Sequence, residues 1–359
     1  MRIGLLIYGT LGTLSGGYLY DRRLVEHLQS KGDEVEIVSL PWRNYLRHLG
    51  DNLSGSLYTR LKELQVDLLL QDELNHPSLF WLNRRLQNQV SYPIIAIVHH
   101  LRSSEVHPTP IKSLYRWVER RYLDTVDGFI YNSQVTRQAV EKTIGKKSPG
   151  VVVHPGRDHQ DPQISKNQIM QRAYDPGPLR LLFLGNVIPR KGLLFLLKAL
   201  NQLPKNTWQL EVVGSLQVDP TYVRKVRRYI EKQALYDNIK LSGRLAAKEL
   251  KEQMTQSQIL AIPSSYEGFG IAYLEGMGYG LPAIASTAGG AGEIINHGQN
   301  GFLVKPGDYS TISRLINELN HDRDRLGKMS QAAQQRYLNH PTWEQSGVQI
   351  DSFLTSMVS

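Results

Sequence analysis

The sequence predicts an α/β protein built from two doubly wound domains, and three observations support this. Short apolar runs of strand length alternate with amphipathic helical segments along most of the chain, which is typical of parallel sheets covered by helices. The chain has 359 residues, more than a single hydrophobic core usually serves. A strand, a loop and a helix open each half, beginning at Ile3 and at Arg180.

The first domain is predicted over residues 1–157, and the polar, proline-containing segment 158–178 is expected to be an interdomain connection. Apolar runs predict its strands at Ile3–Tyr8, Glu34–Leu40, Asp67–Leu70, Ile94–Val98, Gly128–Tyr131 and Val151–Val153. Helical spacing of apolar residues predicts helices at Tyr18–Gln29, Pro41–Leu53 and Ile111–Leu123.

The second domain is predicted over residues 179–341. Its strands are expected at Arg180–Leu184, Leu210–Val213, Ile239–Ser242, Ile259–Ile262 and Ala283–Ser286. Its helices are expected at Leu193–Leu200, Tyr222–Lys232 and Phe269–Tyr279, and a last helix is expected at Trp343–Met357.

The chemistry centres on residues 259–293, ILAIPSSYEGFGIAYLEGMGYGLPAIASTAGGAGE. Glu267 follows a buried strand, and Glu275 lies just inside the helix that begins near Gly270. The N–H groups at a helix start attract phosphate, and ionised carboxylates accept hydrogen bonds from hydroxyl groups. A strand end that offers N–H donors to phosphate and carboxylate acceptors to hydroxyl groups is suited to bind a nucleotide-sugar.

This segment resembles the donor-site signature of the retaining GT-B glycosyltransferases of family 4 (glycosyl transferases group 1). The resemblance rests on the Glu-x7-Glu spacing of Glu267 and Glu275, on the Gly-Leu-Pro turn after the helix, and on the loop GGAGE at 289–293. It implies two Rossmann-like domains that face each other across a cleft. It also implies that the last helix, residues 342–359, packs back on the first domain.

The resemblance implies roles for particular residues. His99, after the strand Ile94–Val98, is expected to touch the donor sugar and the reaction centre, with His100 as the second choice. Arg190 and Lys191 are expected to stabilise the departing diphosphate; the family usually has arginine where this chain has Asn186. The resemblance also implies donor contacts at Gly16, Gly17, Arg244, Gly268, Phe269, Gly270 and Ile271, with Glu267 on the sugar and Glu275 on the ribose.

The resemblance implies a hexosyltransferase that retains the anomeric configuration. The departing phosphate would take the acceptor's proton, so that no metal and no other cofactor are expected. The expected partners are a nucleotide-sugar, a UDP-sugar first, and an acceptor that is a glycan, a lipid or a small molecule. A glycolipid, a lipid-linked glycan or a polysaccharide precursor is the favoured acceptor. Two alternatives remain open: a nucleotide-sugar epimerase or phosphorylase on the same fold, and a non-catalytic nucleotide-sugar-binding subunit.

Composition and charge limit which partners and which cellular compartment are expected. The chain contains no cysteine and no apolar run near the ~20 residues that span a bilayer, and its N-terminus has no cleavage site, so a cytoplasmic protein is expected. The net charge of +9 is spread over both halves without a nucleic-acid-binding motif, so nucleic acid is not an expected partner. For the basic, aromatic helix after Pro41, two interpretations stay open: peripheral contact with the inner face of a membrane, and packing on its own sheet.

Overall fold

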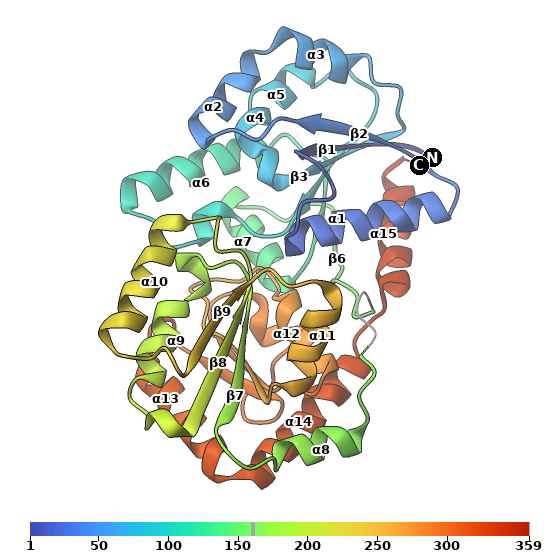
Figure 1. The fold of residues 1–359 in the computed structure, drawn as a ribbon. Helices are drawn as coiled ribbons and strands as arrows, with labels where there is room; N and C mark the ends of the chain where they lie inside the picture. Colours follow the sequence, from blue (N-terminus) through green and yellow to red (C-terminus); the bar gives the residue numbers. More distant parts are fainter. Residues whose placement is uncertain (159–161, 359) are drawn as a thin grey trace. The chain divides into compact units, whose positions relative to one another are not determined.

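A computed structural model of the chain describes residues 1–158 and 162–358. The chain divides into two compact units, Met1–Gly156 together with Pro341–Ser359, and Arg157–His340 (Figure 1). Each unit holds one six-stranded sheet whose neighbouring strands are all parallel, with helices on both faces. The predicted class, two doubly wound α/β domains, is confirmed.

The first sheet has the order β2-β1-β3-β4-β5-β6. Its strands are β1 (Arg2–Tyr8), β2 (Glu34–Leu40), β3 (Leu68–Asp72), β4 (Ile94–Val98), β5 (Gly128–Tyr131) and β6 (Gly150–Val152). Its helices are α1 (Gly16–Ser30), α2 (Tyr45–Leu49), α3 (Gly55–Lys62), α4 (His76–Leu79), α5 (Leu82–Leu86), α6 (Thr109–Leu123), α7 (Gln134–Ile144) and α15 (Trp343–Val358). The strand order reverses direction between β1 and β3, which makes this the switch point of the sheet.

Alternation along the strands gives the first sheet two separate cores. In β1, Leu5 and Ile7 point to the core that α1 and α15 cover, while Leu6 and Tyr8 point to the opposite core. Helix α15 buries Ile350 and Leu354 against the first of these cores. The C-terminal helix therefore completes the first unit, although the whole second unit precedes it in the chain.

The second sheet has the order β12-β11-β10-β7-β8-β9, with its switch point between β7 and β10. Its strands are β7 (Leu179–Leu184), β8 (Trp208–Val213), β9 (Ile239–Gly243), β10 (Ile259–Ile262), β11 (Ala283–Ser286) and β12 (Gly301–Val304). Its helices are α8 (Lys166–Ala173), α9 (Leu193–Leu200), α10 (Pro220–Lys232), α11 (Ala247–Gln256), α12 (Ile271–Gly278), α13 (Tyr309–His321) and α14 (Arg323–Leu338). Helix α9 packs with α10 and α13, and α14 packs with α8 and α12, in layers on either side of the strands (Figure 1).

Short 3-10 helices connect several of these elements. They are η1 (Gly50–Leu53), η2 (Glu73–Asn75), η3 (Arg102–Ser104), η4 (Pro189–Lys191), η5 (Lys205–Thr207) and η6 (Gly290–Glu293). The described helices are all too short or too polar to span a lipid bilayer.

The segment expected as an interdomain connection, residues 158–178, contains a helix of the second unit, and residues 159–161 lie outside the described part. Helix α8 begins with a capping box between Ser165 and Gln168 and buries Ile169. Arg172 of α8 donates hydrogen bonds to four backbone carbonyls at the ends of α11 and α12, those of Met254, Thr255, Tyr279 and Gly280. Carbonyls at a helix end have no acceptor role left inside the helix, so Arg172 satisfies them and connects α8 to the ends of α11 and α12.

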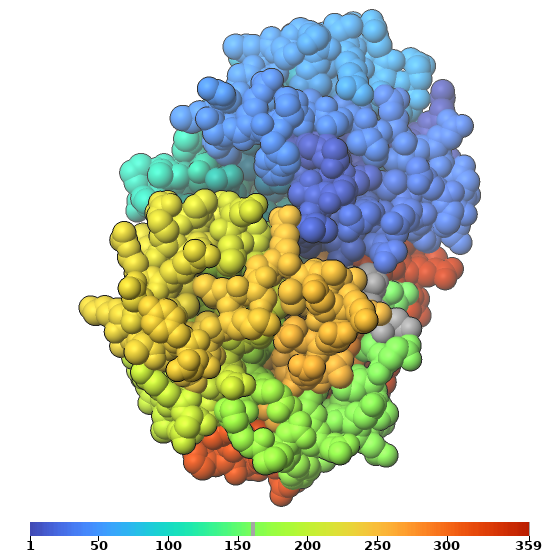
Figure 2. Space-filling model, in the orientation of Figure 1, coloured from blue at the N-terminus to red at the C-terminus, as the bar shows by residue number. Residues whose placement is uncertain are grey.

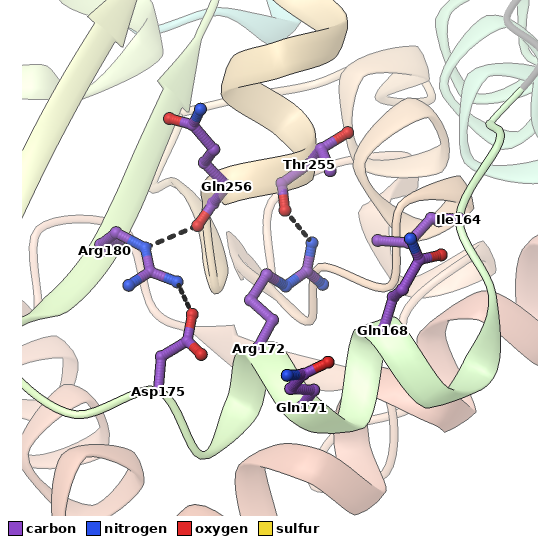
Figure 3. Close-up of a pocket in the computed structure, with 8 residues that line it drawn as sticks. All are labelled: Ile164, Gln168, Gln171, Arg172, Asp175, Arg180, Thr255 and Gln256. Carbon is purple, nitrogen blue, oxygen red and sulfur yellow. Dashed lines mark hydrogen bonds and ion pairs between the residues drawn. The ribbon is translucent and has the colours of Figure 1, made fainter.

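A cavity of about 490 Å³ lies beside Arg172 and is also lined by Asp175 and Arg180 (Figure 3). Arg180 donates to the carboxylate of Asp175 and to the backbone carbonyl of Gln256. The cavity lies where β7 begins, whereas ligands of doubly wound sheets bind where the strands end. We therefore interpret this cavity as structural.

The prediction of one helix with a single apolar stripe over Pro41–Leu53 is wrong. Asn44 caps a short α2, and the chain continues into η1 at Gly50. His48 is buried, whereas Leu46 and Leu53 are 69% and 68% exposed. The expected apolar stripe is therefore divided: Trp42, Leu46 and Leu53 are exposed, whereas Tyr45 and Leu49 are half-buried.

Candidate active site

In the first unit, polar groups gather at the carboxyl ends of β1, β3 and β4. Helix α1 begins at Gly16, and its cap Ser15 accepts a hydrogen bond from the N–H of Tyr18 at 3.3 Å. The N–H groups of Gly16 and Gly17 lie in the first turn, where the helix offers them no carbonyl acceptor, and they are suited to bind an anion. A Cβ atom on Gly17 would lie 2.9 Å from Cδ2 of His99. Glycine at this position therefore lets the helix start lie directly against the imidazole.

His99 is held by Asp21, a fully buried residue of α1. Its Nε2 lies 3.0 Å from Oδ1 of Asp21, and its ring meets the edge of Tyr20 with a centroid distance of 5.4 Å. Burial alone would lower the pKa of His99, but the charge and hydrogen bond of Asp21 outweigh it and raise the pKa to about 9. His99 is therefore an imidazolium at neutral pH.

Asp72, at the end of β3, belongs to the same cluster. One ligand atom from each of Asp21, Asp72 and His99 lies within 4.8 Å of the others, so the three residues meet a geometric requirement for a metal site. Burial, followed by the charge of Asp21, raises the pKa of Asp72 to about 7. The imidazolium of His99 already supplies a cation to this cluster, which favours a hydrogen-bonded site over a metal site.

His100 lies in a different environment from His99. Its Nε2 is 2.9 Å from Oε1 of Glu105, and Oε2 of Glu105 is 3.6 Å from Nε2 of His107. The structure therefore separates the two candidate histidines: His99 joins α1, and His100 joins the loop that leads to α6.

In the second unit, two cations from the loop after β7 meet a carboxylate from the loop after β10. Nζ of Lys191 lies 2.6 Å from Oε1 of Glu267, and Nη1 of Arg190 lies 3.5 Å from Oε2. The hydroxyl of Ser264 donates to Oε1 of Glu267 at 2.6 Å, and Arg190 also donates to the backbone carbonyl of Tyr266 at 2.9 Å. Strands β7 and β10 are neighbours at the switch point, which is why residues so distant in sequence come together.

The two cations keep the carboxylate of Glu267 ionised. Burial opposes ionisation of Glu267, but the charges of Lys191 and Arg190 and the hydrogen bonds from Lys191 and Ser264 lower its pKa to about 2. One carboxylate thus lies beside two cations. Glu267 accepts a hydrogen bond from Lys191 and lies beside Arg190, so it also positions these two cations.

A second glycine loop supports the turn that carries Glu267. The N–H of Gly290 donates to the carbonyl of Glu267 at 2.8 Å. A Cβ atom on Gly290 would lie 2.2 Å from the carbonyl oxygen of Gly268, and one on Gly289, where φ is +97°, would lie 1.9 Å from that of Glu267. The backbones approach too closely for any side chain, so both glycines are required by packing.

The remaining predicted residues have different surroundings. Helix α12 begins at Ile271 after Gly270, whose φ of +99° favours glycine. Phe269 is buried in the core and Ile271 packs partly against it, so their side chains serve packing and only their backbones lie at the helix start. Glu275 is half-buried in α12, Asn186 is half-buried after β7, and Arg244 is exposed after β9.

Sequence reasoning missed Asp21, Asp72 and Ser264. Asp21 lies on the buried face of an amphipathic helix, 78 residues before His99, and a charged residue at an apolar helix position was the available signal. Ser264 lies three residues before Glu267, and nothing local distinguishes it from other turn serines.

Two parallel six-stranded sheets, each with polar groups at its switch point, define a protein of the GT-B class. Two family models match consecutive parts of the chain: Glycosyltransferase Family 4 over residues 19–161, and Glycosyl transferases group 1 over residues 165–336. Together the two models cover most of the chain, which belongs to the group 1 glycosyltransferases of family 4.

Curated relatives and solved structures agree with this assignment. An uncharacterized glycosyltransferase of Methanocaldococcus jannaschii is 28% identical over 65% of this chain and 60% of its own length. A GDP-mannose-dependent alpha-(1-6)-phosphatidylinositol monomannoside mannosyltransferase of Mycobacterium tuberculosis is 26% identical over 67% of this chain. The match covers 64% of that relative, so the chain spans less than two thirds of both.

The fold is shared with solved structures of low sequence identity. Sucrose-phosphate synthase of Thermosynechococcus elongatus has a TM-score of 0.81 at 19% identity, covering 99% of this chain and 98% of its own. HepE of Anabaena, in complex with UDP-glucose, has a TM-score of 0.78 at 20% identity, covering 99% of this chain and all of its own.

Proposed function

We propose that the protein is a retaining glycosyltransferase that moves a hexose from a nucleotide-diphosphate sugar to an acceptor hydroxyl. The observation that carries this proposal is the triad of Lys191, Arg190 and Glu267 at the switch point of the second sheet. It lies beside the turn that leads into α12, whose first N–H groups add further donors for a phosphate.

The chemical need is to stabilise charge on the leaving group. The bond between the anomeric carbon and the diphosphate breaks through an oxocarbenium-like state, and negative charge grows on the departing phosphate oxygen. Groups fixed in place before the reaction stabilise such charge without reorganising, and Lys191 is held in this way by Glu267. The side chains of Arg190 and Lys191 are of the types that bind phosphate oxygens.

The acceptor oxygen would bond to the anomeric carbon on the face that the phosphate leaves. Its proton would pass to the departing phosphate oxygen, so that no protein base and no metal are needed. Glu275 would accept hydrogen bonds from the ribose, and Glu267 from the sugar hydroxyls. In the first unit, His99 and the helix-start amides of Gly16 and Gly17 would supply further positive charge. Unchanged activity in EDTA would support the metal-independent step.

For the donor we propose a UDP-sugar first, since the structurally similar HepE is described with UDP and with UDP-glucose. For the acceptor we propose a glycolipid, a lipid-linked glycan or a polysaccharide precursor. The mannosyltransferase relative, whose name specifies a phosphatidylinositol monomannoside, supports a lipid-linked acceptor. A thermal-shift screen with UDP-, GDP- and ADP-sugars would identify the base, because a ligand of the folded state raises its stability with concentration.

Substitution of Lys191 and of Glu275 tests the site. We expect Lys191→Ala and Glu275→Ala each to reduce the rate of sugar transfer at least about tenfold, because each removes a charge or acceptor aimed at the donor. Lys198→Ala is the matched control, since Lys198 is an exposed cation on the adjoining helix α9. Transfer would be measured with the donor that the screen identifies, and circular dichroism would confirm folding.

Near-normal turnover of both active-site variants would contradict the assignment of the site. Product analysis with and without acceptor separates transfer from the other activities of this fold. An epimer formed without acceptor would indicate an epimerase, dependence on inorganic phosphate would indicate a phosphorylase, and a bound but unreacted donor would indicate a binding subunit.

We also propose a cytoplasmic protein that contacts the inner face of a membrane peripherally. Trp42, Leu46 and Leu53 are more than half exposed, and Arg43 and Arg47 lie beside them. Apolar side chains next to arginines suit an interface of anionic lipid. We expect co-sedimentation with anionic vesicles that a Leu46→Ser, Leu53→Ser double variant weakens, whereas Leu338→Ser, at an exposed leucine of α14, leaves it unchanged. Equal sedimentation of all three proteins would contradict this surface.

A further inference from the structure

A second polar cluster lies buried in the first unit, next to the residues that surround His99. Glu73 follows Asp72 at the end of β3, His76 begins α4, and Glu119 lies in α6. The three residues are 3%, 1% and 0% exposed. One ligand atom from each lies within 4.8 Å of the others, although they come from three separate elements.

Two carboxylate oxygens of this cluster lack hydrogen-bond partners. Oε1 of Glu119 accepts the backbone N–H of Ser103 at 3.0 Å. Oε2 of Glu119 and Oε1 of Glu73 make no hydrogen bond with the residues that the structure describes. Nδ1 of His76 lies 3.1 Å from Oε1 of Glu73 but is hydrogen-bonded to the backbone carbonyl of the same residue. A buried carboxylate that is left unpaired is costly, and such groups normally meet a cation or coordinate a metal.

The histidine of the cluster, His76, contacts both Glu73 and Tyr45. Its Nδ1 lies 2.9 Å from the carbonyl oxygen of Glu73 and 3.1 Å from Oε1 of the same residue, and its Nε2 lies 3.1 Å from the hydroxyl of Tyr45. The neighbouring cluster of Asp21, Asp72 and His99 is separate, and the imidazolium of His99 is its cation.

The neighbouring arginine offsets only part of the negative charge. The guanidinium of Arg102 lies over the rings of Tyr45 and Tyr115, 5.2 and 4.7 Å from their centroids. Ligand atoms of Glu73 and Glu119 lie within 4.8 Å of each other, close enough for one cation to contact both.

We propose that Glu73, His76 and Glu119 bind one divalent ion of the zinc type, as a structural ion of the first unit. Two carboxylate oxygens and one imidazole nitrogen form a donor set that Zn²⁺ accepts readily. The ion would replace the hydrogen bond between Nδ1 of His76 and the carbonyl oxygen of Glu73, and Nε2 would then carry the proton and donate to Tyr45. The bond from Ser103 to Glu119 would orient the second ligand, as outer partners do in metal sites.

The ion would connect the segment after β3 to α6. That segment directly follows Asp72, which lies in the cluster of His99, so the ion would also fix one side of the site around His99. The inference is independent of the proposed sugar transfer, because it concerns the metal content and stability of the chain and not its activity.

Metal analysis of the full chain tests the inference. The purified protein would be dialysed separately against Zn²⁺, Mn²⁺ and Mg²⁺, and the bound metal would be measured by mass spectrometry. We expect about one equivalent of zinc per wild-type chain and a loss of at least about tenfold in occupancy in Glu119→Gln. Asp72→Asn is the matched control, because it removes a buried carboxylate of the neighbouring cluster, and it should keep the zinc.

Two results would overturn the inference: no retained zinc in the wild-type protein, and loss of zinc in Asp72→Asn but not in Glu119→Gln. A preference for Mg²⁺ over Zn²⁺ would also contradict it, since an imidazole ligand favours the transition metal. If Glu119→Gln does not fold, Glu73→Gln serves as the second variant, and zinc should raise the melting temperature of the wild-type protein alone.

Discussion

At the scale of single residues, the paired His99 and Asp21 set the charge of the first-unit site. The pKa of His99 is raised from an ordinary value of 6.5 to about 9 in the folded protein. The pairing therefore contributes stability that is fully present below pH about 6.5 and is lost as the pH rises through about 9. If the imidazolium stabilises the donor's phosphate, transfer should decline over the same upper range.

Asp21→Asn should move that decline toward lower pH, because the neutral amide no longer holds the proton on His99. The measurement is the pH profile of transfer in wild type and variant, with Glu26→Gln as the control. Glu26 lies on the exposed face of the same helix and pairs only with Arg23 among the described residues. A decline at the same pH in Asp21→Asn would show that His99 does not carry the relevant charge, or that Asp21 does not set it.

These residue-scale contacts mark how far the sequence could predict the site. Lys191 and Glu267 were predicted because each lies in a recognisable strand-to-helix loop. The contact between them was not predicted, since it depends on β7 and β10 being neighbours in the sheet. Asp21 was missed for a similar reason: its partner follows a strand that lies two positions away from β1 in the order. A local stretch of sequence shows which residue types are present. Which of them come into contact depends on the order of the strands in the sheet.

At the scale of elements, buried strands were the most predictable features. Ile94–Val98 and Ile259–Ile262 occur in the structure with the bounds expected from their apolar runs. Surface helices were less predictable: α8 is held by a capping box and by Arg172, not by a long apolar stripe. Helix α10 could be predicted because its buried residues repeat regularly and its basic residues are exposed. Figure 2 shows this segment, in yellow, at the surface.

The loop at 289–293 yields a prediction at the same scale. Gly290→Ala should weaken donor binding at least about tenfold, because its Cβ would collide with the carbonyl of Gly268 and displace the turn that carries Glu267. Gly292→Ala is the matched control, since a Cβ there would meet only Cδ1 of Leu303, at 3.7 Å. Calorimetric titration with the nucleoside diphosphate measures both variants.

Equal affinities of the two glycine variants would contradict this explanation of the loop. The same result would indicate that the loop adjusts its backbone without moving Glu267, and that its glycines serve folding alone.

At the scale of the whole molecule, the chain leaves the first unit at Gly156 and returns to it at Pro341. The first unit is therefore incomplete until the last helix has been made. Helix α15 packs on α1 so closely that a Cβ atom on Gly347 would lie 2.4 Å from the ring of His27. The second unit, in contrast, is one continuous segment with its own core.

This arrangement predicts that a substitution in α15 destabilises the first unit and leaves the second unit unchanged. Leu354 is fully buried, and Leu354→Ala should cost about 2–5 kcal/mol of stability through lost burial and the cavity left behind. Hydrogen exchange should then accelerate in β1, β3 and β4, while β7, β8 and β10 keep their protection. Val348→Ala, at a half-exposed position of the same helix, should change neither set. Faster exchange in both sheets would mean that the two units unfold together, and unchanged exchange in the first sheet would mean that α15 does not hold it.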